Sequence, residues 1–173
     1  MNKEIFPTII YTEHVNEISD QENEIIKKEC YSLCNCGETT FFTNKSLHGL
    51  DVFKNLCIII EKRVISYVHS LGFQGAIKWG QMWLTISEKG GHHGLHHHKG
   101  ALIAGTYYVS IPKDEPLFLD FYDERIRISS SEYSEKIEDK KLILFEGSVL
   151  HGFKPNPSRE HKIALSFNFL PAA

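Results

Sequence analysis

Apolar residues recur at intervals of three and four in two segments of the amino-terminal half of the chain, which is the spacing of one helix face. The first predicted helix covers Glu22–Cys34. The second covers about residues 52–71 and ends before Gly72, a residue type that commonly closes helices. A strand is predicted ahead of both helices at Ile5–Tyr11, and Pro7 favours an edge position for it.

From Ile77 onward, short runs of β-branched and aromatic residues separated by turns replace the helical pattern. Many short strands without intervening helices predict a mainly β chain of the α+β class, with an antiparallel sandwich or barrel as its core. The polar segment Ile128–Lys141 is predicted to be an exposed, mobile excursion and the best-placed segment for a lid. The predicted strands lie at residues 77–87, 99–110, 117–122, 125–129, 142–145, 148–153 and 161–169.

Composition sets the size of the fold and the class of its partners. With 173 residues and 42% hydrophobic content, the chain suits one domain, 1–173, in which residues 1–75 support a core at 76–173. The net charge of -3 offers no positive excess for nucleic acid or anionic membrane, so we expect a small-molecule or peptide substrate and also allow for a homodimer. Without a signal core or a membrane-spanning apolar stretch, we expect a cytoplasmic protein.

Five of the ten histidines fall within residues 92–98, and His151 lies far along the chain. On a strand, residues i and i+2 point to the same face, so His96 and His98 would present two imidazoles to one ion while His97 faces away. His151 would be the third ligand. Three imidazoles suit Fe(II), Zn(II), Cu or Ni, so the ligand type alone does not select the metal.

A histidine-rich run can also be a solvated loop or an adventitious metal binder. The mid-chain position of this run, ahead of the apolar stretch Ala101–Val109, favours a structured site. His92 and His93 precede the predicted strand, so we expect them to shape a loop.

Residues on two other strands offer a site for an anion. Lys162 lies on the last predicted strand, and a lysine that points into a core is costly unless an anion meets it. If Lys162 faces the same interior as His151, Lys162 and the Tyr108 hydroxyl would hold a cosubstrate that bears a carboxylate. Arg159, in the preceding turn, is the alternative basic anchor.

Several motifs follow one another along the chain: Ile5-Phe6-Pro7-Thr8-Ile9-Ile10-Tyr11, the strand of Trp83, His96-x-His98, Gly105-x-Tyr107-Tyr108-Val109-x-x-Pro112, Phe121-x-Asp123-x-Arg125, Phe145-x-Gly147-x-x-x-His151 and Ile163-x-x-Ser166-Phe167-Asn168. In this order they resemble the iron(II)- and 2-oxoglutarate-dependent oxygenases, specifically a small bacterial and phage group with His-x-His in place of His-x-Asp. The resemblance spans nearly the whole chain. It implies a double-stranded β-helix, the jelly-roll barrel of cupin-like proteins, packed on amino-terminal helices.

The resemblance also implies roles for the candidate residues. His96, His98 and His151 would hold Fe(II), while Lys162 and Tyr108 would grip the distal carboxylate of 2-oxoglutarate. Such a dioxygenase takes 2-oxoglutarate and O2 as cosubstrates, hydroxylates an unactivated C–H bond, and releases succinate and CO2. Two departures stand out: most relatives have a carboxylate at the position of His98, and most have arginine, a planar fork rather than a point charge, at that of Lys162.

Three further residues are weaker candidates for the lining of the pocket. Trp83 would fill the barrel or face the pocket, and Asp123 and Arg125 would line the pocket or form a surface ion pair. Two other functions stay open: a three-histidine cupin dioxygenase that acts without 2-oxoglutarate, and a noncatalytic metal-binding jelly-roll module. The spacing of these residues does not specify a substrate.

Overall fold

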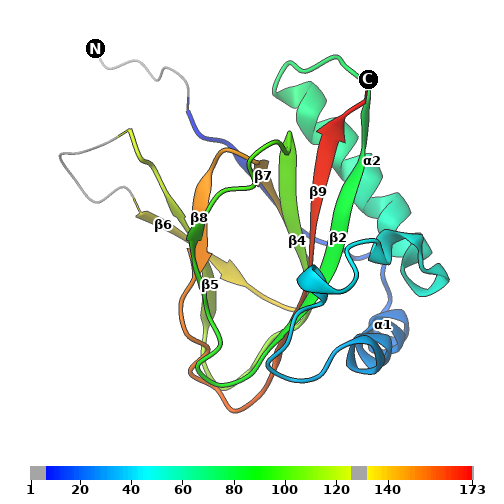
Figure 1. Ribbon diagram of the computed structural model, residues 1–173, viewed down its shortest axis with the longest axis vertical. Coiled ribbons are helices and arrows are strands. Elements are labelled where there is room, and N and C mark those ends of the chain that lie inside the picture. The colour runs from blue at the N-terminus through cyan, green and yellow to red at the C-terminus, as the bar shows by residue number, and fades with distance from the viewer. Residues whose placement is uncertain (1–6, 126–131, 173) are drawn as a thin grey trace.

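The computed structural model describes residues 7–125 and 132–172, and its strands form two antiparallel sheets that face each other (Figure 1). The strands are β1 Ile10–His14, β2 Ile77–Ser87, β3 His93–His96, β4 Ile103–Ser110, β5 Leu117–Tyr122, β6 Glu132–Ile137, β7 Lys141–Glu146, β8 Leu150–Phe153 and β9 Lys162–Pro171. The larger sheet has the order β1-β7-β4-β9-β2 and the smaller one the order β3-β8-β5-β6. This arrangement confirms the predicted double-stranded β-helix.

Two helices, α1 Asp20–Leu33 and α2 Lys54–Ser70, lie on the outer side of the larger sheet (Figure 1). Three single 3-10 turns connect them, at Thr40–Phe42, Leu47–Gly49 and Asp51–Phe53. Both helices therefore confirm the predicted support for the barrel. No helix in the described part of the chain is long and apolar enough to cross a membrane.

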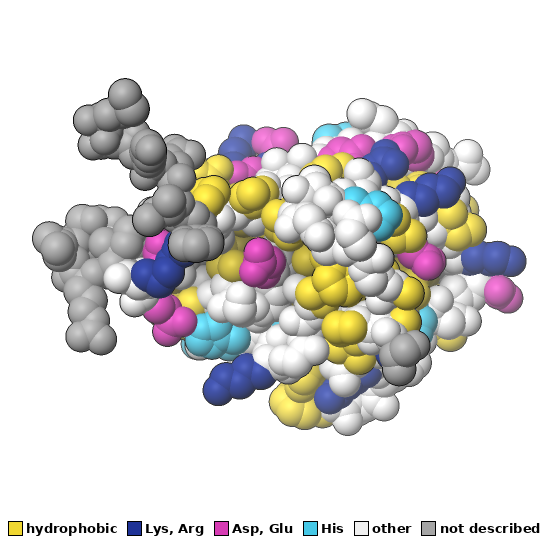
Figure 2. All heavy atoms as spheres, turned by 90° about the horizontal axis from the view of Figure 1, so that it is seen from above, with side chains coloured by type: hydrophobic (Ala, Val, Ile, Leu, Met, Phe, Trp, Pro, Cys, Tyr) yellow, Lys and Arg dark blue, Asp and Glu magenta, His cyan; other side chains and the backbone are white. Residues whose placement is uncertain are grey.

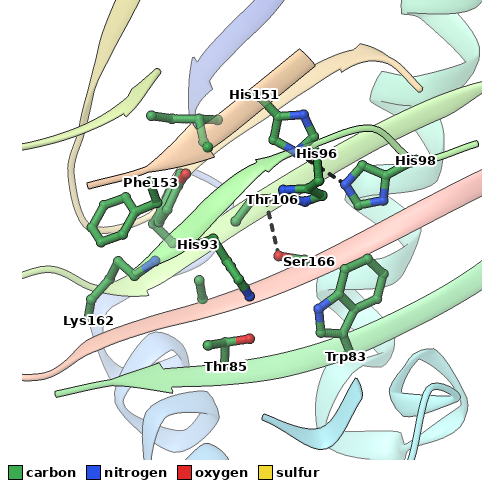
Figure 3. A pocket seen from close by; sticks show the side chains of 14 residues that line it. Trp83, Thr85, His93, His96, His98, Thr106, His151, Phe153, Lys162 and Ser166 are labelled. Carbon is green, nitrogen blue, oxygen red and sulfur yellow. Dashed lines mark hydrogen bonds between the residues drawn. The ribbon is translucent and has the colours of Figure 1, made fainter. Parts of the chain in front are cut away.

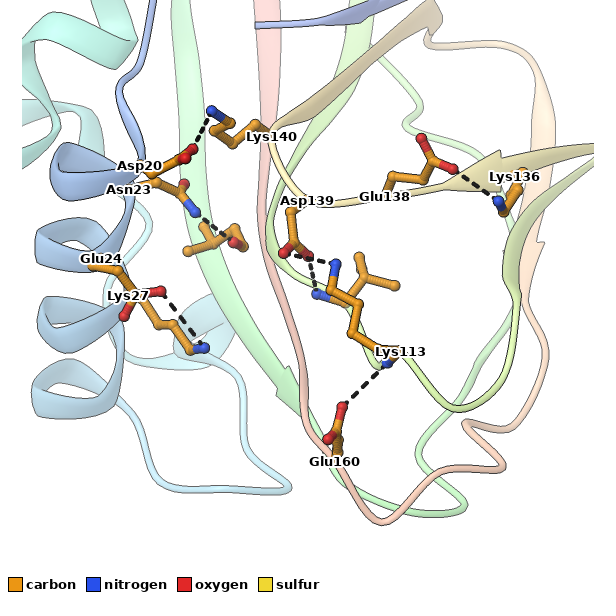
Figure 4. Close-up of polar contacts among 12 residues, drawn as sticks. Asp20, Asn23, Glu24, Lys27, Lys113, Lys136, Glu138, Asp139, Lys140 and Glu160 are labelled. Atoms are coloured by element: carbon orange, nitrogen blue, oxygen red, sulfur yellow. Dashed lines mark hydrogen bonds and ion pairs between the residues drawn. The ribbon is translucent and has the colours of Figure 1, made fainter. Parts of the chain in front are cut away.

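A buried asparagine fastens α1 to the sheet (Figure 4). The Asn23 side-chain N–H donates to the Val109 carbonyl at 2.8 Å, and the Tyr107 hydroxyl donates to Asn23 Oδ1 at 2.9 Å. At the start of the helix, Lys140 pairs with Asp20 at 2.5 Å. Because a buried polar group is costly without partners, this network fixes the position of α1 on the sheet.

Alternation along β9 separates two cores. Ile163, Leu165 and Phe167 belong to the core between the larger sheet and the helices. The intervening side chains of Lys162, Ala164 and Ser166 line the interior of the barrel. Period-two alternation of a strand produces this division, because successive side chains point to opposite faces. The site is therefore built from the face of β9 that the helices do not cover.

The structure corrects two predicted elements. The opening strand is Ile10–His14, not Ile5–Tyr11; residues 7–9 form no strand, and residues 1–6 lie outside the described chain. The predicted mobile excursion Ile128–Lys141 is also wrong where it is described, because β6 pairs with β5 over six residues. β6 is an edge strand with mostly exposed side chains, so its polar composition concealed it. Most of the predicted strand 125–129 lies outside the described residues.

Candidate metal centre and its cavity

Three histidines meet at one end of the barrel interior (Figure 3). His96 ends β3 and pairs in register with His151 on β8. His98 reaches the same point from the loop after β3, where its backbone N–H donates to the Gly147 carbonyl at 2.9 Å. One ligand nitrogen from each ring lies within 4.8 Å of the others. The expected alternation of His96 and His98 along a single strand is wrong, since the strand ends at His96 and the turn delivers His98.

Backbone carbonyls orient two of the three rings. His96 Nδ1 lies 2.8 Å from the Gly94 carbonyl, and His151 Nδ1 lies 2.9 Å from the Val149 carbonyl. A carbonyl only accepts, so each Nδ1 carries the proton and donates it. The Nε2 lone pairs of both rings are then free for a metal, as in histidine ligands whose second nitrogen is held by a neighbouring acceptor.

Burial keeps two of these rings neutral. Burial, together with a smaller effect of the neighbouring histidines, lowers the pKa of His98 to about 4 and the pKa of His151 to about 3. A neutral imidazole is the form that binds a metal, so at neutral pH no proton has to be displaced from either ring. The donor set of three imidazoles at one point therefore fits Fe(II).

The histidines line a small cavity of about 50 Å³ that extends to Lys162 and Tyr108. Lys162 is 5% exposed and its Nζ lies 3.5 Å from the centroid of the Phe153 ring. None of the ion pairs among the described residues includes Lys162. Burial lowers the pKa of Lys162 to about 7, with no anion to oppose it. A buried ammonium without a counter-charge fits a cosubstrate that brings a carboxylate.

The structure also places the alternative anchor and the weaker candidates. Arg159 is exposed and does not line the cavity. Trp83 is buried and lines it, with its ring centroid 5.8 Å from that of His98. Asp123 and Arg125 form an ion pair at 2.9 Å away from the cavity lining. Their position agrees with the alternative of a surface ion pair.

The other histidines of the run divide into two groups. His92 is exposed, and His97 Nε2 lies 2.7 Å from a Glu124 carboxylate oxygen, away from the cluster. His93, expected only to shape a loop, lies on β3 and lines the cavity near Lys162 (Figure 3). His93 as a whole is exposed, but partial burial of its ring and the charge of Lys162 lower its pKa to about 4. The pairing of β3 with β8, which no local sequence pattern predicts, places His93 at the edge of the cavity.

Small polar residues of the larger sheet complete the lining. Thr85 of β2, Thr106 of β4 and Ser166 of β9 face the cavity, and the Thr106 and Ser166 hydroxyls lie 3.3 Å apart. Thr85 and Thr106 were not predicted to line the site, and Ser166 was named only as part of a motif. The signal available was alternation, because Ser166 stands four residues after Lys162 on one strand and so shares its face.

The family model described as "Putative 2OG-Fe(II) oxygenase" matches residues 81–168, which is 88 of the 173 residues and includes all three clustered histidines. The chain belongs to this 2OG-Fe(II) oxygenase family. Its members are oxidoreductases that use Fe(II), 2-oxoglutarate and O2. A sequence search of curated proteins gives no match for this oxygenase.

Solved structures share the fold of this oxygenase at low sequence identity. HygX from Streptomyces hygroscopicus, crystallised with nickel and 2-oxoglutarate, is 11% identical with a TM-score of 0.71, over 95% of this chain and 83% of HygX. A Pseudomonas putida prolyl-4-hydroxylase is 9% identical with a TM-score of 0.68, over 96% and 89% of the two chains. A viral collagen prolyl hydroxylase from Paramecium Bursaria Chlorella virus-1 is 13% identical with a TM-score of 0.68, over 99% and 98%. These likenesses support the fold.

Proposed function

We propose that His96, His98 and His151 are the protein ligands of Fe(II) in this 2-oxoglutarate-dependent dioxygenase. One ligand nitrogen from each of the three rings lies within 4.8 Å of the others, and backbone carbonyls hold two of the rings in the tautomer that leaves Nε2 free. The aromatic ring of Phe145 packs against His151 with centroids 4.4 Å apart and limits its rotation. Bound Fe(II) would activate O2 together with 2-oxoglutarate, so that oxidation of a substrate C–H bond is coupled to release of succinate and CO2.

Lys162 and Tyr108 are the proposed grip on the distal carboxylate of 2-oxoglutarate. The observation that carries this assignment is the buried, uncompensated Lys162 ammonium in the same cavity as the three imidazoles. The Tyr108 side chain is buried and lines the same cavity, and burial raises the pKa of its hydroxyl well above the usual range, so the group stays a neutral donor. An ammonium and a hydroxyl together would bind a carboxylate and exclude water from it.

We propose hydroxylation of a small molecule or of a peptide side chain, carried out by one domain that spans residues 1–173. The helices of 1–75 share one core with the outer face of the barrel sheet, which supports a single folding unit. A homodimer stays a prediction, which sedimentation analysis of the purified protein would check.

The test is an anaerobic titration with Fe(II) followed by 2-oxoglutarate. A visible metal-to-ligand charge-transfer band that appears only after 2-oxoglutarate is the expected result, followed by succinate formation when O2 is admitted. The Lys162→Met variant should bind metal normally but form the band only at much higher 2-oxoglutarate. A protein that binds iron and consumes O2 with a substrate but never forms the band would be a three-histidine dioxygenase of the cupin type. Iron binding that changes stability alone, with no consumption of O2, would identify a noncatalytic module.

A further inference from the structure

A groove of about 490 Å³ adjoins the histidine cluster and shares Trp83, His96 and His98 with the cavity, but Lys162 does not line it. Phe41, Phe42 and Trp83 give it an aromatic wall, and the Phe42 side chain is 84% exposed. An aromatic ring this exposed at a rim is unusual in a protein without a ligand, because water contact with a large apolar side chain is unfavourable. The groove therefore suits a molecule with an apolar body.

An amide without a partner lies in the same groove. Asn168 is a lining residue, and its side-chain oxygen is buried with no hydrogen-bond donor in the described part of the chain. Asn168 follows Lys162 by six residues on β9, which at about 3.4 Å per residue is about 20 Å along the strand. A five-carbon dicarboxylate held at Lys162 cannot extend that far. An N–H or O–H donor on a second ligand, the substrate, would satisfy Asn168.

The charged side chains that line the site are basic, and an acidic group outside the lining, Glu124, lies 2.7 Å from the lining residue His97. Neither the cavity nor the groove is lined by an Asp or Glu of the described chain, whereas Lys162 lines the cavity and Lys99 the groove. Elsewhere acidic and basic side chains are mixed, as Figure 2 shows for one face, and the whole chain has a net charge of -3. The lack of acidic lining is therefore local to this site.

With Fe(II) and 2-oxoglutarate bound, a count of the formal charges in the site shows an excess of positive charge. Three imidazoles contribute none, Fe(II) contributes two positive charges, Lys162 contributes one, and 2-oxoglutarate brings two negative charges. One positive charge is left over, which an aspartate in place of His98 would cancel. In a site shielded from water, an uncompensated charge is costly, so an anionic group on the substrate would be favoured there.

We propose that the substrate is an apolar or aromatic carboxylate that also carries an N–H or O–H group, with Lys99 and Asn168 as the residues that select it. Lys99 receives the carboxylate, Asn168 accepts the hydrogen bond, and Phe41, Phe42 and Trp83 cover the apolar body. This inference rests on the proposed function, since it places the substrate beside loaded iron and 2-oxoglutarate. N-acylated aromatic amino acids are simple compounds with all three features.

The experiment measures binding by calorimetry, without O2, to the protein loaded with Fe(II) and 2-oxoglutarate. The probes are N-acetylphenylalanine, its neutral amide, and 3-phenylpropionate, which lacks the N–H group. We expect the acid to bind about tenfold more tightly than the amide, and several-fold more tightly than 3-phenylpropionate. Lys99→Gln should remove the preference for the acid over its amide. Asn168→Leu should remove the preference for N-acetylphenylalanine over 3-phenylpropionate. Lys78→Gln, at an exposed lysine of β2 outside the groove, is the matched control and should keep both.

Stability provides a second readout for Asn168. Replacement by leucine removes a buried acceptor that has no partner, so the free energy of unfolding should stay equal or rise while the preference for the N–H group is lost. If Asn168 instead stabilised the fold, its replacement by leucine would lower the free energy of unfolding. If N-acetylphenylalanine binds no better than its amide, or if Lys99→Gln keeps the difference, the inference is overturned. The charge-transfer band is recorded in the same samples, so absence of the band would mark a failure of the proposed function instead.

Discussion

His98 Nε2 lies 3.2 Å from His151 Nε2, although His98 comes from a loop and His151 from β8. The two rings are nearly parallel, at 11° with centroids 5.0 Å apart. His151 donates through Nδ1 to a backbone carbonyl, so its Nε2 presents a lone pair toward His98. Two nitrogens held this close, with a third from His96, are already arranged to share one ion.

Exchange of His98 for aspartate should keep metal binding, because two histidines and one carboxylate are also a ligand set that Fe(II) accepts. We expect the affinity for Fe(II) or Co(II) to stay within about tenfold of the unchanged protein, whereas His151→Ala should weaken it by about 100-fold or more. The metal-dependent rise in melting temperature, measured without O2, reports the metal affinity of both variants.

His97→Ala is the matched control for this pair of variants. His97 lies between the two ligands in sequence, but its ring faces Glu124 at 2.7 Å. Its loss should leave the metal-dependent rise in melting temperature unchanged. A loss of metal binding in His97→Ala equal to that in His151→Ala would contradict the ligand assignment.

Binding of 2-oxoglutarate should weaken as the pH rises above about 7. Burial lowers the pKa of Lys162 to about 7 in the ligand-free protein, so the ammonium is present below this pH and is lost above it. A dianion binds the charged form, so binding above pH 7 requires uptake of a proton. The dissociation constant should then rise by up to about tenfold per pH unit between pH 7 and 9. Anaerobic titrations of the metal-loaded protein at several pH values measure this slope.

The Lys162→Arg variant separates this effect from other titrations. Arginine stays protonated over the whole range, so the dissociation constant for 2-oxoglutarate in this variant should change little between pH 7 and 9. An equal slope in both proteins would assign the pH dependence to a group other than Lys162.

The spacing of apolar residues along the sequence predicted the elements that pack one apolar face against the core. Strands 77–87 and 117–122 match β2 and β5 because each has a clear run of apolar residues. The edge strand β6 was not predicted, and the strand expected at His96 and His98 lies instead at His93–His96, since most side chains of both strands are exposed and backbone pairing defines them.

The same distinction applies to the site. The spacing of His96, His98 and His151 was enough to nominate three residues that the structure brings together. His93 was not predicted to line the cavity, because its direction depends on the register of β3 against β8, a contact between segments almost sixty residues apart. Asn168 was named only as part of a motif. Its lack of a partner is a property of packing, which spacing does not encode.

Stability should depend strongly on Asn23, the residue that fastens α1 to the sheet. Asn23→Ala leaves the Val109 carbonyl and the Tyr107 hydroxyl without their buried partner, so the free energy of unfolding should fall by about 1–3 kcal/mol. Glu24→Ala, next in sequence but exposed and paired only with Lys27 at 3.9 Å, should change it by less than about 0.5 kcal/mol. Urea denaturation of the two variants compares them, and equal midpoints would show that the buried network contributes nothing.

Gly147 should control the metal centre without touching the metal. A Cβ atom there would lie 2.4 Å from the Ala101 carbonyl oxygen and 2.9 Å from that of His98, and backbone atoms cannot move aside as a flexible side chain can. Gly147→Ala must therefore displace the turn that carries His98, whose N–H donates to the Gly147 carbonyl. We expect about tenfold weaker metal binding and a loss of about 1–3 kcal/mol in stability.

Gly49→Ala is the control for Gly147→Ala, because a Cβ at Gly49 meets nothing within 4 Å. Gly49 lies in a 3-10 turn with no positive φ, so an alanine there is not strained. Its metal affinity should equal that of the unchanged protein. If Gly147→Ala loses stability but binds Co(II) with unchanged affinity, the position of His98 is independent of this close approach. Weaker metal binding in Gly147→Ala alone would instead show that the glycine of the Phe145-x-Gly147-x-x-x-His151 motif exists to place a ligand fifty residues earlier in the chain.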